Sequence, residues 1–84
     1  MEPGLALQEF LEFIVGQLVD HPEKASVLHE KDGNRHVYRI RVGKEDVGKV
    51  IGRNGYTISA MRSLLQAAAQ RNKIKAALKL DEVE

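Results

Sequence analysis

The chain has 84 residues, no cysteine and a formal net charge of +1. That length suits one small domain with a modest core, and the lack of cysteine excludes a disulfide framework and thiolate chemistry. No apolar run approaches the ~20 residues of a membrane-spanning helix, and an N-terminus with Glu2, Glu9 and Glu12 is unlike a secretory signal. We therefore expect a soluble cytoplasmic protein with no membrane or small-molecule partner.

Charge is distributed unevenly along the chain. Residues 1–32 carry a net charge of −5, residues 33–80 carry +9, and the acidic end at residues 81–84 carries −3. A basic block of this kind is a plausible footprint for a polyanion, whereas lysines and arginines on strands can simply form the solvated face of a sheet. We favour the footprint for cations near residues 52–55 and the solvated face for those on strands.

Residues 5–19 predict an amphipathic helix. Its buried face follows the three-and-four spacing of helical side chains and comprises Leu7, Phe10, Leu11, Ile14 and Leu18. The helix should end at Asp20-His21-Pro22, because proline disfavours helical angles in the residue before it.

Two strands should follow this helix. Residues 25–30 alternate weakly and favour a short edge strand, and residues 31–34 form a turn with the Asp-Gly pair typical of hairpins. Residues 36–42 alternate cleanly. In this second strand we expect Tyr38, Ile40 and Val42 to face the core, and Arg39 and Arg41 to face away.

The second half of the chain predicts two helices and a strand. The acidic pair at residues 45–46 suits a helix N-terminus, and the short helix that follows should stop at Gly52. A longer helix from Tyr56 or Thr57 to residues 71–72 should bury Ile58, Met61, Leu64, Leu65 and Ala68. Residues 73–80 alternate again, with Ile74, Ala76, Leu78 and Leu80 inward and Lys73, Lys75 and Lys79 outward.

The order helix–strand–strand–helix–helix–strand predicts an α+β fold. A crossover of roughly thirty residues before the last strand suits a parallel, right-handed connection. The result should be a three-stranded mixed sheet with all helices on one face, in a single domain over residues 1–84. Its core should span about residues 5–80, with a short acidic tail at residues 81–84.

The segment Gly52-Arg53-Asn54-Gly55, here called the glycine loop, is the most informative part of the sequence. Glycine adopts backbone angles that other residues resist and leaves room for close approach. A helix N-terminus behind the loop would offer free N–H groups and a partial positive charge to a phosphate, and Arg53 would add a full charge. The loop therefore suits a polyanion, although a plain helix–helix turn is the simpler alternative.

With Val47 to Ile51 in front of it, the glycine loop resembles the V-I-G-x-x-G signature of KH domains. The order of elements is similar to the type II, or prokaryotic, KH topology, and the resemblance covers nearly the whole chain. Together with Asp20-His21-Pro22 at the end of the first helix, it extends to small bacterial RNA-binding proteins made of one KH domain.

The resemblance implies a non-catalytic protein whose loop clamps the backbone of about four nucleotides of single-stranded RNA. It also implies a homodimer, or a heterodimer with a larger protein that joins a KH domain to a second nucleic-acid-binding domain. The implied role is that of a post-transcriptional regulator or RNA chaperone linked to cell elongation and division, cell shape and cell-wall organisation.

The predicted RNA-binding residues are Val47, Lys49, Val50, Ile51, Gly52, Arg53, Asn54, Gly55 and Tyr56. Gly52 and Gly55 let the RNA backbone approach closely. Lys49 and Arg53 contact phosphates without reading the base sequence, or they are solvated surface charges. Asn54 takes left-handed angles or caps the next helix. Tyr56, where the family often has a basic or polar residue, stacks on a base or packs at the helix start. The apolar side chains pack in the core and, by the resemblance, floor a groove for single bases.

No catalytic, metal or cofactor site is expected. The three histidines lack metal-ligand spacing, and the glycines match neither a Walker loop nor a dinucleotide fingerprint. Two rival functions stay open. One is a protein-interaction module that uses the fold mainly to pair, which the off-stripe Phe13 and Val19 would suit; the other is a single-stranded DNA binder.

Overall fold

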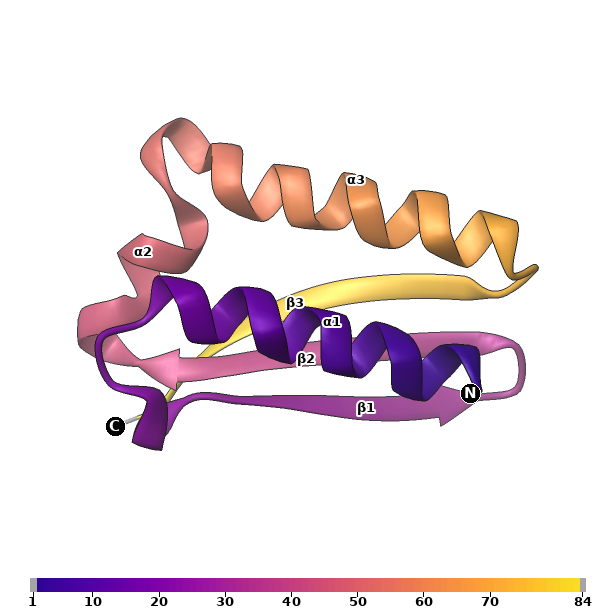
Figure 1. The fold of residues 1–84 in the computed structure, drawn as a ribbon, viewed down its shortest axis with the longest axis horizontal. Coiled ribbons are helices and arrows are strands. Elements are labelled where there is room, and N and C mark those ends of the chain that lie inside the picture. Colours follow the sequence, from indigo (N-terminus) through magenta and orange to yellow (C-terminus); the bar gives the residue numbers. More distant parts are fainter. Residues whose placement is uncertain (1, 84) are drawn as a thin grey trace.

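The computed structural model describes residues 2–83 as a sheet with helices packed on one face (Figure 1). The helices are α1 (Pro3–Leu18), α2 (Val47–Ile51) and α3 (Tyr56–Arg71), and the strands are β1 (Ser26–Asp32), β2 (Arg35–Gly43) and β3 (Lys75–Val83). Single 3-10 turns lie at Pro22–Lys24, Lys44–Asp46 and Arg53–Gly55. The predicted order of elements and the α+β class are confirmed.

Strand β2 lies at the centre of the three-stranded sheet. It pairs antiparallel with β1 across a two-residue loop, since Asp32 pairs with Arg35, and parallel with β3. Gly33 gives this loop its positive φ of 63°. The mixed sheet that the sequence predicted is therefore correct.

Strand β3 differs from the prediction at both ends. Lys73 was expected on its outer face but lies before the strand, in the turn after α3, with φ of 58°. At the other end β3 continues past Leu80 to Val83, which pairs with Gly43. Residues 81–83, expected as a tail, thus extend the strand, and residue 84 lies outside the described range.

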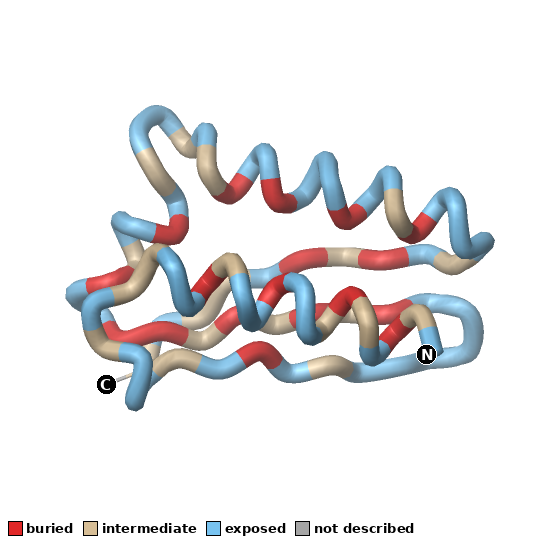
Figure 2. Tube along the Cα trace, in the orientation of Figure 1, coloured by how far each residue is buried: buried red, intermediate tan, exposed pale blue. Residues whose placement is uncertain are grey.

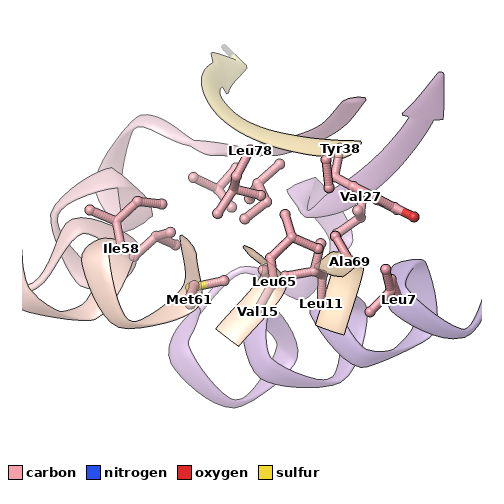
Figure 3. Packing of buried hydrophobic residues seen from close by; sticks show 14 residues of the cluster. Leu7, Leu11, Val15, Val27, Tyr38, Ile58, Met61, Leu65, Ala69 and Leu78 are labelled. Atoms are coloured by element: carbon pink, nitrogen blue, oxygen red, sulfur yellow. The ribbon is translucent and has the colours of Figure 1, made fainter. Parts of the chain in front are cut away.

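The core forms where α1 and α3 meet the inner face of the sheet (Figure 3). Figure 2 shows the alternation of buried and less buried positions along β2. The buried residues include Leu7, Leu11 and Val15 of α1, Tyr38, Ile40 and Val42 of β2, Ile58, Met61, Leu65 and Ala69 of α3, and Leu78 of β3.

Two residues expected in the core are exposed. Phe10 is 38% exposed and Leu64 is 56% exposed. In α1 the buried positions recur every four residues from Leu7 to Val15, which leaves Phe10 at the margin of the stripe. In α3 the stripe includes Ala69 and Leu65, so the adjacent Leu64, about 100° around the helix, must face outward.

The first turn of α1 is held to the sheet by polar contacts. The hydroxyl of Tyr38 donates to the carbonyl of Gly4 at 3.0 Å. The stacked rings of His29 and His36 share a hydrogen bond of 2.7 Å between Nε2 and Nδ1. A Cβ at Gly4 would lie 2.6 Å from Cε1 of His29, so only glycine lets the helix approach this closely. The two histidines lie on strands, and His21 lies between α1 and the first 3-10 turn.

This histidine pair predicts a pH-dependent stability. Burial lowers the pKa of His36, and the nearby charges of His29 and Lys31 lower it further against the attraction of Glu2. Because the folded protein favours neutral His36, its contribution is complete above the unfolded pKa of about 6.5 and is lost as pH falls towards the lower folded value. The free energy of unfolding in urea should therefore decrease between pH 7.5 and pH 5.

Two variants test the assignment to this pair. His36→Gln should reduce the pH dependence, whereas Ser63→Gln, at an exposed position of α3 with no titratable group, should preserve it. Equal free energies of unfolding at pH 7.5 and pH 5 in the unmodified protein would contradict the role given to His36.

Candidate nucleic-acid interface

The glycine loop projects at one end of the domain, between α2 and α3 (Figure 1). Helix α2 ends at Ile51, and the N–H of the following Gly52 donates to the carbonyl of Gly48 at 2.9 Å. A single 3-10 turn follows, closed by a 3.1 Å hydrogen bond from the N–H of Gly55 to the carbonyl of Gly52. Helix α3 then begins at Tyr56.

Three of the four loop residues have positive φ. Gly52 has φ of 77° and ψ of 173°, a combination open in practice only to glycine. Asn54 (φ 56°, ψ 22°) and Gly55 (φ 75°, ψ 12°) are left-handed. Asn54 thus adopts one of its two expected conformational roles, whereas the N-cap of α3 is Gly55 and has no side-chain hydrogen bond.

The start of α3 consequently presents backbone donors that no side chain caps. The first N–H groups of a helix lack partners within the helix; here those of Gly55 and Tyr56 donate to the carbonyls of Gly52 and Arg53 in the preceding 3-10 turn, and a glycine N-cap has no side chain to accept those that follow. Arg53 and Asn54 are exposed beside these donors. Among residues 2–83, Arg53 has no carboxylate within ion-pair distance. The loop therefore combines a helix start that no side chain caps with an available positive charge.

The apolar residues of the predicted site separate into two groups. Val50 has no exposed surface and belongs to the core, so it supports α2 from beneath and cannot contact a ligand. Val47 is half-buried and Ile51 is exposed. Tyr56 is 69% exposed at the first position of α3. The surface beside the loop is therefore formed by Val47, Ile51 and the ring of Tyr56.

Lys49 forms ion pairs with two carboxylates. Its Nζ lies 3.1 Å from the carboxylate of Asp20 and 3.6 Å from that of Asp46. The hydrogen bond to Asp20 and the negative charges of both partners raise the pKa of Lys49. The sequence predicts a phosphate contact for Lys49, and in the structure its side chain lies towards the end of α1.

Asp46 is a structural residue that the sequence did not single out beyond its place at a helix start. Its carboxylate is fully buried and accepts the backbone N–H groups of Asp20 at 3.1 Å and His21 at 2.9 Å. Burial opposes ionisation, but these hydrogen bonds and the charges of His21 and Lys49 lower its pKa overall. The linker after α1 leaves N–H groups that need an acceptor, but no local pattern in the sequence assigns the distant Asp46 to them.

Helix α3 is tied to the edge of β3 behind the loop. The amide of Gln66 donates to the carbonyl of Ala76 at 2.7 Å, and Arg62 reaches the carbonyl of Leu78 at 3.5 Å. Within residues 2–83 no cluster of three or more His, Cys, Asp or Glu could hold a metal. No helix in that range is both long and apolar enough to cross a membrane.

The loop geometry predicts different costs for its two glycines. A Cβ at Gly52 would overlap the side chain of Thr57, whereas one at Gly55 would meet no atom within 4 Å. Gly55→Ala should cost about 1–2 kcal/mol, the usual penalty of left-handed angles. Gly52→Ala should cost at least about 3 kcal/mol, because overlap adds to the strain. Urea unfolding measures both, and equal costs would contradict this geometry.

Comparisons with known proteins agree with this architecture. The family described as "KhpA/KhpB, KH domain" matches residues 8–80. The protein named "RNA-binding protein KhpA" of Chlamydia muridarum is 41% identical over 76 residues, covering 90% of this chain and 97% of its own. Its namesake in Listeria monocytogenes is 37% identical over 76 residues, covering 90% of this chain and all of its own. The protein of the same name in Thermotoga maritima is 43% identical over 61 residues, covering 73% of this chain and 81% of its own.

Proposed function

Because this chain belongs to the KhpA/KhpB KH-domain family, we propose that it binds single-stranded RNA and clamps the sugar–phosphate chain with the glycine loop. The family is non-catalytic, and its curated members above are named for RNA binding. The observation that carries the proposal is the positive-φ loop, which lies at one end of the domain (Figure 1). The loop brings Arg53 next to the start of α3, which no side chain caps.

Each part of the loop has a physical role in this proposal. Gly52 and Gly55 let the phosphates approach the backbone, and the helix N-terminus stabilises their negative charge. Arg53 adds affinity without sequence information. Bases would lie over Val47 and Ile51, and stacking on Tyr56 would contribute about 1–3 kcal/mol. Asn54 shapes the turn through its left-handed angles.

A single loop of this size should bind weakly and with strong salt dependence, since phosphate contacts dominate. Two loops in one assembly would raise the affinity through effective concentration. We therefore propose a homodimer, or a heterodimer with a KhpB-like protein that also contains a KH domain. The role would be cytoplasmic post-transcriptional control, as a regulator or RNA chaperone linked to cell elongation, cell shape and cell-wall organisation.

A function based mainly on protein pairing is the second candidate, and it is favoured by exposed apolar side chains away from the loop. Leu5 and Phe13 on α1 and Leu64 on α3 are 45%, 64% and 56% exposed. Large apolar side chains of this kind are typical of protein contacts when they cluster.

The double variant Arg53→Asp/Asn54→Asp tests the RNA proposal. It should fold, because both side chains are exposed, and it should lose at least about tenfold in affinity for a fluorescent single-stranded RNA at moderate salt. The matched control is Lys31→Asp/Asn34→Asp, with the same change in charge, at the β1–β2 hairpin on the opposite end of the long axis. The control should retain most of the affinity.

Three other outcomes separate the rivals. Equal affinity of the loop variant and the unmodified protein would contradict the clamp. A folded loop variant that also stops dimerising, measured by sedimentation, would assign the loop to assembly. A DNA strand of matched sequence that binds more tightly than the RNA would favour the DNA-binding alternative.

A further inference from the structure

Lys49 lies in a cluster of acceptors next to the glycine loop. Besides the carboxylates of Asp20 and Asp46, its Nζ lies 3.5 Å from the backbone carbonyl of Glu45. Asp46 precedes α2, and Asp20 lies in the linker after α1. One ammonium group therefore joins the C-terminal end of α1 to the helix that leads into the loop.

The same two segments are joined a second time by the buried carboxylate of Asp46. Its two oxygens accept N–H groups from consecutive linker residues, Asp20 and His21. We call the group formed by Asp20, Asp46 and Lys49 the α1–α2 clasp. It contains no atom of the glycine loop, yet Gly52 is only three residues beyond Lys49.

Helix α2 needs such support because it has only five residues. A helix of one or two turns is not stable by itself in water, so its direction depends on what it is attached to. Val50 attaches it to the core on one side. The clasp attaches its first turn on another side. Val50 and the clasp together set the position from which Gly52 starts the loop.

The charge of the clasp also disfavours phosphate. Lys49 contributes one positive charge and the two aspartates contribute two negative charges, which leaves the clasp at −1. The carboxylate of Asp20 is 68% exposed, so a phosphate that approached Lys49 would meet it directly. The RNA backbone is better accommodated at Arg53, which has no carboxylate of residues 2–83 within ion-pair distance.

From these contacts we propose that Lys49 is a positioning residue, which holds α2 and the glycine loop through the α1–α2 clasp and makes no contact with RNA phosphate. Only the second part of this inference, that Lys49 makes no contact with RNA phosphate, rests on the proposed RNA binding. Arg53 is then the cation of the site that neutralises a phosphate.

The first experiment is the salt dependence of binding to a fluorescein-labelled oligouridine. Each phosphate contact contributes about 0.7 to the slope of log K against log salt for single strands. Arg53→Gln should lower the slope by about this amount. Lys49→Gln should weaken binding by a similar factor at every salt concentration and leave the slope unchanged. A slope lowered equally by both variants would overturn the inference.

The second experiment needs no RNA. In Lys49→Gln the amide hydrogen of Gly52, which bonds to the carbonyl of Gly48, should exchange faster than in the unmodified protein. Arg53→Gln is the control and should leave that rate unchanged. Asp20→Asn should also raise it, and the double variant with Lys49→Gln should add little further.

The two experiments distinguish a failure of the clasp from a failure of the proposed RNA binding. Unchanged exchange at Gly52 in Lys49→Gln would overturn the clasp even if RNA binds as proposed. If the unmodified protein binds no oligouridine or other single-stranded RNA, the proposed function fails, and the exchange rates still decide whether the clasp positions the loop.

Discussion

The backbone angles of Gly52 direct the chain from α2 into the glycine loop, and the arrangement of the site depends on that direction. With φ of 77° and ψ of 173°, and with Thr57 against the missing side chain, this position admits only glycine. The loop then turns through two left-handed residues, so that α3 begins without a side-chain cap. The start of α3, which no side chain caps, and the charge of Arg53 come together for this reason, although neither is unusual alone.

A domain of this size has little core to fix its helices, and polar anchors at element ends supply part of that order. The carboxylate of Glu2 accepts the N–H groups of Gly4 and Leu5. Gln8 donates to the carbonyl of Val27 on β1, as Gln66 does to Ala76 on β3. Asp46 performs the same task at the other end of α1. These anchors satisfy backbone groups at the start of α1, at the sheet edges and in the linker. Asp46 and Gln66 also help to hold α2 and α3 in position around the loop.

The sequence predicted the elements, the mixed sheet and the position of the loop because each depends on local patterns. Alternation located β2, and the two glycines with the intervening cation located the loop. The contributions of Asp46 and Lys49 could not be predicted, because they depend on contacts across more than twenty residues with the linker after α1. Phe10 and Leu64 were misplaced for a related reason, since each helix offers two apolar faces and only packing selects one.

The most direct test of the central claim is a titration of ¹⁵N-labelled protein with a short single-stranded RNA, followed by amide chemical shifts. If the start of α3 and the glycine loop hold the backbone, the largest changes should fall on the amides of residues 52–58. Changes centred on the exposed face of α1 or on the open face of the sheet, with the loop amides unmoved, would contradict the account.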